Sequence, residues 1–305
     1  MQIVRIWNPS TNAAVLAAVD GGDAVDLSHA WASFPGLIGA ARREGKSPAA
    51  LAQAAIKTSS QRWPLNSLLQ AEAHPVVAHL LQPVDAEEYW GAGVTYERSR
   101  LARMAESQSA DVYARIYSAE RPEIFFKSTP SRCVGPNQPV GIRADSRWSV
   151  PEPELALVLD GDGAILGYTL GNDMSARDIE GDNPLYLPQA KVYQACCAIG
   201  PTVLLAEGGQ HPEFEINLRI ERKGEEVFNG STSTARMRRT FDELAAYLRR
   251  HNPLPQVTVL LTGTGIVPPD EFTLQEGDVV EISSPLLGTL RNPVEQVETV
   301  QAAQG

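Results

Sequence analysis

The chain has 305 residues, of which 43% are hydrophobic and 21% charged, and its formal net charge is −11. This length accommodates one large domain or two unequal domains with a substantial core. Because a strongly acidic chain repels nucleic acid and anionic lipid, neither is an expected partner, and a small anionic substrate requires a local counter-charge.

The first 83 residues are predicted to form a small α+β domain. Strands are expected at residues 2–7 and 14–19, which surround an Asn-Pro-Ser turn. Apolar residues at helical spacing predict helices over 30–44 and 48–56. The stretch after them connects to the rest of the chain, and we place the domain boundary near Pro83.

Residues 84–305 are predicted to form a second, catalytic domain. Short strands with glycine and proline punctuation dominate it, and two helices are expected, over 97–104 and 240–250. The polar segment 96–122 is either a mobile cover over a site or a surface excursion. Because the strands do not alternate with helices, the fold class is α+β. The expected strands are 155–159, 165–170, 215–222, 257–262, 279–282 and 290–294.

Cysteine usage and the chain's apolar pattern favour a soluble, cytoplasmic protein. Cys133, Cys196 and Cys197 have no metal-ligand spacing, so we expect reduced, buried thiols. The first ten residues lack the basic and apolar pattern of a secretory signal. No apolar run approaches the length of a membrane span.

Three carboxylates are predicted to lie on one face of a β-hairpin. Glu152 and Glu154 stand two residues apart in an extended, proline-flanked segment, so both point to the same side. A tight turn over residues 160–163 leads to the second strand. With a two-residue loop, Glu152 falls opposite Gly171, and Asp173 lies diagonally from it on the same face. A register error of one residue would move Asp173 to the other face.

These carboxylates predict a metal centre. Converging carboxylates repel one another unless a cation lies between them. All-oxygen ligands suit Mg²⁺, Mn²⁺ or Ca²⁺ better than zinc. The spacing alone leaves open that Glu152 and Glu154 line a solvated strand face. The predicted ligands are Glu152, Glu154 and Asp173.

Longer motifs resemble the fumarylacetoacetate hydrolase superfamily over residues 90–297. They are Pro-Glu-Ile-Phe-Phe-Lys at 122–127, Glu-Pro-Glu at 152–154, and Gly-Tyr-Thr-Leu-Gly-Asn-Asp-Met-Ser-Ala-Arg-Asp at 167–178. The resemblance implies a catalytic domain built on a mixed β-roll, together with a homodimer or homotetramer. It also implies that the three carboxylates bind Mg²⁺ or Mn²⁺.

A narrower resemblance is to the 2-keto-3-deoxy-D-arabinonate dehydratases within that superfamily. It is carried by residues 90–97, 120–123 and 183–191, and by the small N-terminal domain. It implies that the substrate is a small 2-oxo acid and that Glu123 and Lys191 transfer protons. Without the resemblance, Lys191 is read as a surface lysine and Glu123 as a strand-end carboxylate.

The implied reaction, in pentose metabolism, converts 2-keto-3-deoxy-D-arabinonate or a similar pentonate to 2,5-dioxopentanoate. A metal ion chelated by the C1 carboxylate and the C2 oxygen would stabilise the enolate formed when a C3 proton leaves. Glu123 and Lys191 would remove that proton and protonate the departing C4 hydroxyl, and the sequence does not decide which is the acid.

Three further residues, Gly93, Lys127 and Thr264, are expected to bind the substrate on the strength of the resemblance. Lys127 holds the substrate or orders the carboxylates, or it is a plain strand lysine. Thr264 can bind the substrate carboxylate through its hydroxyl and backbone N–H, although glycine-rich turns also form for steric reasons. Arg177 and Asp178 are expected to form a buried structural pair.

Other functions stay open. A C–C bond hydrolase of a 2,4-diketo-3-deoxy sugar acid or an acylpyruvate needs an activated water, for which hydrolases of this family carry a histidine and a glutamate on a lid helix. The equivalent stretch 93–100 has Glu97 but no histidine, which favours elimination. An isomerase or decarboxylase of a 2-oxo dienoate is a third enzyme. A non-catalytic sugar-acid binder is disfavoured because all the expected site residues are present.

Overall fold

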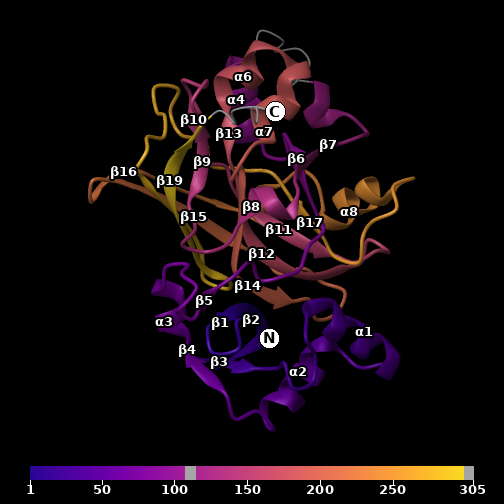
Figure 1. Cartoon of the computed structure of the whole chain (residues 1–305). Coiled ribbons are helices and arrows are strands. Elements are labelled where there is room, and N and C mark those ends of the chain that lie inside the picture. Colours follow the sequence, from indigo (N-terminus) through magenta and orange to yellow (C-terminus); the bar gives the residue numbers. More distant parts are fainter. Residues whose placement is uncertain (107–114, 299–305) are drawn as a thin grey trace, which may run out of the picture.

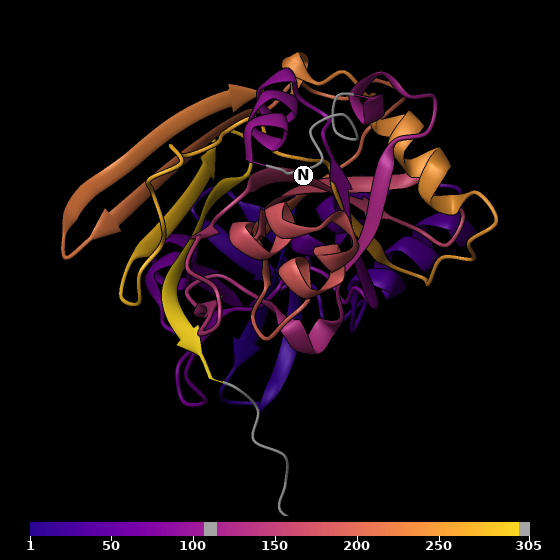
Figure 2. The same cartoon turned by 90° about the horizontal axis from the view of Figure 1, so that it is seen from above.

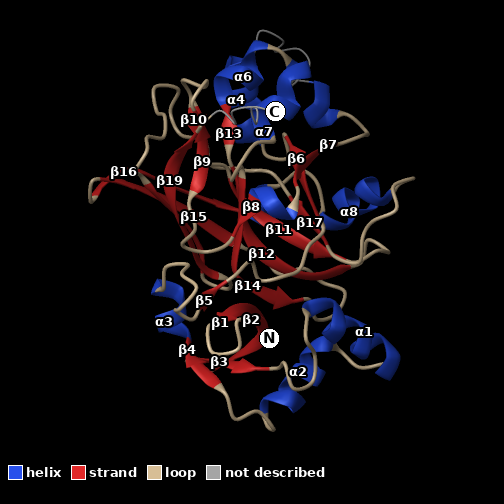
Figure 3. Cartoon of the chain, in the orientation of Figure 1, coloured by secondary structure: helices blue, strands red, loops and turns tan. Residues whose placement is uncertain are grey.

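The computed structural model describes residues 1–106 and 115–298. In these residues the strands form three sheets at the centre of the molecule, and the helices lie around them (Figure 3). The largest sheet has 12 strands and the second has 5. The third consists of β10 (Ser149–Val150) and β13 (Ser175–Ala176). The segregation of strands and helices confirms the predicted α+β class.

The N-terminal segment forms one end of the large sheet. Its helix α1 begins after Ser33, whose hydroxyl accepts a hydrogen bond from Gly36 N, and ends at Gly45 with φ of 61°. The helix therefore starts later than the predicted residue 30. The strands are β1 (Gln2–Asn8), β2 (Ala13–Asp20), β3 (Asp23–Asp26), β4 (Arg62–Pro64) and β5 (His79–Leu80), and the helices are α1 (Phe34–Glu44), α2 (Pro48–Ile56) and α3 (Leu65–Gln70).

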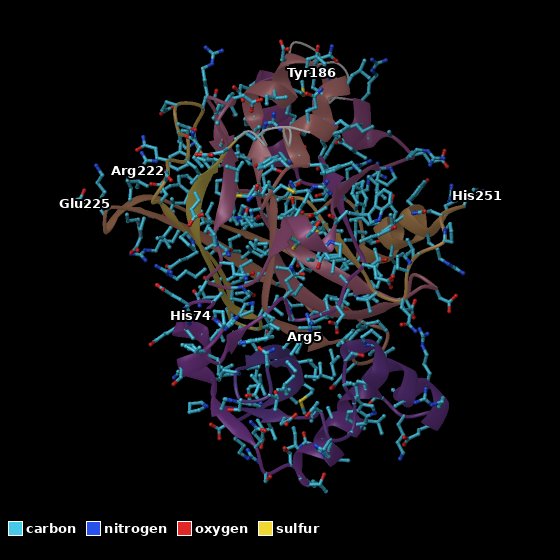
Figure 4. All side chains as sticks on the ribbon, in the orientation of Figure 1. Arg5, His74, Tyr186, Arg222, Glu225 and His251 are labelled. Atoms are coloured by element: carbon cyan, nitrogen blue, oxygen red, sulfur yellow. The ribbon has the colours of Figure 1, made fainter. Side chains whose placement is uncertain are left out.

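This N-terminal segment shares its sheet with the rest of the chain. β1 pairs with β14 (Cys197–Leu205), where Ile3 lies opposite Val203. Arg5, labelled in Figure 4 where the N-terminal strands meet the rest of the chain, forms an ion pair of 2.5 Å with Asp85. The division into domains 1–83 and 84–305 stays a prediction, and the sheet crosses the proposed boundary.

The middle of the large sheet carries the predicted hairpin. From β14 the strand order continues β12-β11-β17-β6-β7, and β8 (Cys133–Val134) pairs with β14. All residues of β11 are buried, as expected for a strand covered on both faces. The bounds are β12 (Ile165–Asp173), β11 (Pro153–Leu159), β17 (Thr258–Leu261), β6 (Glu88–Gly93) and β7 (Glu123–Ser128).

The five-stranded sheet packs on the large one and completes the expected mixed β-roll. Its order is β16-β15-β18-β19-β9, and β18 and β19 contact β12 and β14. The β15–β16 hairpin extends away from the body of the molecule (Figure 2). The bounds are β16 (Glu225–Ser233), β15 (Glu215–Arg222), β18 (Val279–Ser284), β19 (Gly288–Val297) and β9 (Val140–Arg143).

Three helices, α4 (Glu97–Glu106), α6 (Arg177–Asp182) and α7 (Leu187–Lys191), gather at the end of the molecule opposite the N-terminal segment (Figure 1). Of the predicted cover over 96–122, residues 107–114 lie outside the described residues. No helix in the described part of the chain is long and apolar enough to cross a membrane. The remaining helices are α8 (Phe241–Arg249) and the 3₁₀ turns η1 (Pro130–Arg132), η2 (Pro184–Tyr186) and η3 (Thr234–Arg236).

The β11–β12 hairpin corrects the predicted register. Gly171 pairs with Glu154 rather than with Glu152, a shift of two residues. One residue of the shift comes from a longer turn, closed by the Asp160 carboxylate, which accepts two backbone N–H groups of the loop at 2.8 Å each. The other comes from a strand irregularity between Val158 and Leu159. Since a shift of two preserves the face, the prediction that the carboxylates share a face is confirmed. Asp173 N now donates to Glu152 O at 3.0 Å, so the two residues are direct neighbours.

Candidate metal centre and active site

Glu152, Glu154 and Asp173 converge at the open end of the β11–β12 hairpin. Each offers one carboxylate oxygen, and these oxygens lie within 4.8 Å of one another. All three side chains are buried. Three buried carboxylate oxygens are a donor set that a hard divalent cation such as Mg²⁺ prefers. The structure thus brings together the three predicted ligands.

Cationic side chains balance two of these carboxylates. Arg177 donates to Glu152 Oε1 at 2.7 Å. Lys191 Nζ bridges Glu152 Oε2 at 2.5 Å and Asp173 Oδ2 at 3.0 Å. Lys127 Nζ lies 2.6 Å from Asp173 Oδ1. These ion pairs fix the directions of two carboxylates that would otherwise repel each other.

Glu154 has a different environment. Its Oε2 accepts a hydrogen bond of 2.6 Å from Gly263 N. Burial, and then the charges of Asp173 and Glu152, raise the pKa of Glu154 well above its usual value. Gly263 has φ of +94°, and a Cβ there would lie 2.9 Å from Ala92 O, so this donor position requires glycine.

A cavity of about 20 Å³ adjoins the three carboxylates, which is room for a water molecule or an ion. Its walls come from β6, β7, α4, α6, α7 and the loop at residues 263–264. Besides the three predicted metal ligands, the polar side chains that line the cavity are Ser99, Glu123, Glu180, Lys191 and Thr264. Both expected proton-transfer residues, Glu123 and Lys191, therefore face the same cavity.

Gly93 makes room for Glu123. The two residues are paired across β6 and β7, and a Cβ at Gly93 would collide with the Glu123 carboxyl group. Lys191 approaches from α7, and its Nζ donates to Ser175 Oγ at 2.6 Å. The glycine is thus required by the position of the Glu123 side chain, besides lining the cavity itself.

The other two expected substrate-binding residues differ in their access to the cavity. Thr264 lines the cavity. Its hydroxyl donates a hydrogen bond of 3.2 Å to Ile266 O and accepts one of 3.2 Å from Ile266 N. Lys127 has no exposed surface and is not among the described residues that line the cavity.

Some partners in the site differ from the sequence-based expectations. Arg177 pairs with Glu152, not with Asp178, whose carboxylate instead accepts from Ser146 Oγ at 2.6 Å. Ser175 was not predicted, although it stands two residues after Asp173 and alternation in an extended chain places it on the same side. Gly263 gave no signal in the sequence beyond its glycine-rich loop.

Comparison with known proteins shows the following similarities. Residues 90–295 match the family described as Fumarylacetoacetate (FAA) hydrolase C-terminal. Over 220 residues, 72% of this chain and 76% of the relative, the chain is 54% identical to the "Probable 2-keto-3-deoxyxylonate dehydratase" of Haloferax volcanii. Over 223 residues, 71% of this chain and 74% of the relative, it is 47% identical to the "2-dehydro-3-deoxy-D-arabinonate dehydratase" of Saccharolobus solfataricus.

A solved structure also resembles this fold over nearly its full length. Its title is "2-keto-3-deoxy-D-arabinonate dehydratase complexed with magnesium and 2,5-dioxopentanoate". The TM-score is 0.83 at 36% sequence identity, and the match covers 98% of this chain and 100% of the other.

Proposed function

Because the chain belongs to the fumarylacetoacetate hydrolase family, we propose that it is a magnesium-dependent dehydratase that converts a 2-keto-3-deoxy pentonate to 2,5-dioxopentanoate. The observation that carries this function is the buried Glu-Glu-Asp set beside a cavity that also holds a glutamate and a lysine. Relatives that share about half of its sequence over the matched region are named as dehydratases of such acids. The chain is therefore an enzyme with a small 2-oxo acid as substrate and Mg²⁺ as cofactor.

In this function, Glu152, Glu154 and Asp173 hold the metal. A bound Mg²⁺ supplies the positive charge that makes the C3 proton of a 2-oxo acid more acidic. Arg177 and Lys191 keep the Glu152 carboxylate pointed inward through their bonds to its two oxygens. The burial of all three ligands limits the access of bulk solvent to them.

Glu123 and Lys191 carry the two proton transfers of the elimination. They reach the cavity from β7 and α7, and each is held by a neighbour: Glu123 lies against Gly93, and Lys191 donates to Ser175. One of them removes the C3 proton and the other protonates the C4 hydroxyl, which departs as water. A further proton shift turns the resulting enone into the C5 aldehyde.

Gly93 and Thr264 are proposed to contact the substrate. Both line the cavity beside the metal ligands, and the Thr264 backbone N–H suits an oxygen of the C1 carboxylate, whereas its hydroxyl proton is already donated to Ile266 O. The same contact from Lys127 would require its ammonium to leave a fully buried position.

Three broader features complete the proposal. We place the enzyme in the cytoplasm, because Cys133, Cys196 and Cys197 are free thiols buried in the fold. We assign it a homodimer or homotetramer, which the resemblance of its motifs to the family implies. We retain an N-terminal and a catalytic domain with the boundary near Pro83.

The function is tested with the pure protein, Mg²⁺ and 2-keto-3-deoxy-D-arabinonate, with and without EDTA. The expected product is lighter than the substrate by one water molecule, and EDTA abolishes its formation. The Glu152→Gln variant, which cannot supply the carboxylate charge, is expected to fold and to be inactive. Cleavage of a 2,4-diketo-3-deoxy acid into two smaller acids, with no dehydration, would instead make the protein a hydrolase.

A further inference from the structure

A fully buried ammonium group lies behind the metal centre. Lys127 Nζ is 2.6 Å from Asp173 Oδ1, 2.8 Å from Met174 O and 2.5 Å from Lys191 O. A lysine ammonium has three N–H donors and no acceptor. Hydrogen bonds to Met174 O and Lys191 O use two of these donors, and the contact with Asp173 Oδ1 is an ion pair.

Complete burial separates the Lys127 ammonium from the substrate. Glu123 and Phe125, from the same strand, line the cavity, whereas the described cavity wall does not include Lys127. To reach a substrate oxygen, the ammonium would have to abandon one of its partners, and leaving a buried polar group without a partner is costly. The contacts argue against the expected role of Lys127 in substrate binding.

The three acceptors belong to the segments that build the site. Asp173 ends β12, Met174 follows it directly, and Lys191 is the last residue of α7. Lys127 stands on β7, four residues after Glu123. A single side chain thus joins the segments that carry a metal ligand and both proton-transfer residues.

We propose that Lys127 is a positioning residue, which directs the Asp173 carboxylate toward the metal and fixes the backbone of Lys191 without touching the substrate. The inference rests on the proposed function, because it takes Asp173 as a magnesium ligand and Lys191 as a catalytic group. Groups that hold metal ligands in place typically contribute to metal affinity as well as to activity.

The charge state of Lys127 suits this role. Burial, the largest effect, lowers the pKa of Lys127, and Asp173 together with the neighbouring Cys196 and Cys197 raises it, so the pKa lies above its usual value. The ring of Tyr193, whose centroid lies 5.8 Å from Nζ, adds a further favourable contact for a cation.

The Lys127→Met variant tests the proposal, because methionine has a similar shape and no donor. We expect Mg²⁺ affinity, measured by calorimetry, and Mn²⁺ affinity, measured by electron paramagnetic resonance, to fall by about 10- to 100-fold. At saturating metal, kcat for 2-keto-3-deoxy-D-arabinonate should fall while KM changes little. Unaltered metal affinity, or a raised KM with unaltered kcat, would overturn the proposal in favour of a substrate contact.

The matched control is Lys57→Met, which changes an exposed lysine at the end of α2 and should leave metal affinity and kinetics as in the wild type. Circular dichroism and thermal unfolding check that each variant is folded. If Lys127→Met does not fold, Lys127→Gln replaces it, since the amide keeps two donors in a similar volume, and the same outcomes decide.

The metal titration separates failure of this inference from failure of the proposed function, because it needs no sugar acid. If the wild-type protein does not dehydrate the substrate but Lys127→Met binds Mg²⁺ weakly, the proposed function is refuted and the positioning role of Lys127 is supported. If the wild-type protein dehydrates the substrate and Lys127→Met binds Mg²⁺ as tightly as the wild type, only the positioning role is refuted.

Discussion

Glu154 differs from the other two carboxylates of the metal centre in how its charge is balanced. Glu152 and Asp173 each contact at least one lysine or arginine at hydrogen-bond distance, whereas the contact made by Glu154 is with the backbone N–H of Gly263. A neutral donor offsets less charge than an ion pair. The metal is therefore the main counter-charge of Glu154, and metal binding should depend on whether this carboxyl group is ionised.

This imbalance predicts that Mg²⁺ binding strengthens as pH rises. Burial, and then the charges of Asp173 and Glu152, raise the pKa of Glu154, so in the metal-free protein this group holds its proton to a higher pH than an exposed glutamate. A metal needs the ionised form, so binding releases that proton. Below the raised pKa, each unit of pH lost should weaken Mg²⁺ binding about tenfold.

Calorimetric titrations of Mg²⁺ in buffers of different ionisation enthalpy count the released protons at each pH. Release of close to one proton is expected on the acidic side, falling toward zero as pH rises through the raised pKa. The Glu154→Gln variant lacks this metal ligand and is expected to bind Mg²⁺ far more weakly at every pH. Binding that is independent of pH across the neutral and mildly acidic range would refute the assignment.

At the scale of elements, the pairing of β6 with β7 sets the place of the catalytic glutamate. Gly93→Ala adds a methyl group where the Glu123 carboxyl group lies, so the side chain must move away from the cavity. Displacement of a catalytic group by about 1 Å can cost about 100-fold, and we expect a loss of kcat of that order.

The measurement for Gly93→Ala combines steady-state kinetics with Mg²⁺ titration. Metal affinity should stay near the wild-type value, because Glu123 is not one of the three converging carboxylates. Gly22→Ala is the matched control, since a Cβ there meets nothing within 4 Å and the residue has no positive φ. Wild-type kcat in Gly93→Ala would mean that Glu123 does not act from the position seen here.

The β11–β12 hairpin shows what the sequence could and could not predict. Alternation placed Glu152 and Glu154 on one face correctly, because the period of a strand depends only on local geometry. The register was wrong by two residues, because the Asp160 side chain closes a loop longer than a two-residue turn and because the pairing shifts again between Val158 and Leu159. The prediction of the face of Asp173 was still correct, because side chains alternate between the two faces with a period of two residues.

The partners of the site residues were harder to predict than the residues themselves. Motifs identified Arg177, Lys127 and Lys191, but not that Arg177 contacts Glu152, 25 positions earlier in the chain. Such contacts join β11, β12, α6 and α7 through tertiary packing, which leaves no periodic signal in the sequence. The hydrogen bonds of Lys127 follow only from the folded backbone, since both of their acceptors are main-chain carbonyl oxygens.

At the scale of the whole molecule, one sheet runs from the N-terminal strands to the strands of the active site. Ile3 and Phe34 belong to the same hydrophobic core as Leu155. Arg42 of α1 forms an ion pair with Asp160, the residue that closes the β11–β12 loop. The N-terminal segment therefore supports the end of the hairpin that is remote from the metal ligands.

This continuity predicts that residues 84–305 do not form a stable, active enzyme alone. Removing residues 1–83 would expose the edge of β14, which pairs with β1, and the apolar surface that β1, β2 and α1 cover. An unpaired central strand with an apolar face is prone to aggregate. The shortened chain is expected to be aggregated on size-exclusion chromatography and to be inactive.

The whole chain should unfold in denaturant in one transition. Tryptophan fluorescence and activity should be lost together, because residues 1–83 and 84–305 share one core. A shortened chain that is monodisperse, unfolds cooperatively and dehydrates the sugar acid at the wild-type rate would show instead that the catalytic domain stands without the shared sheet.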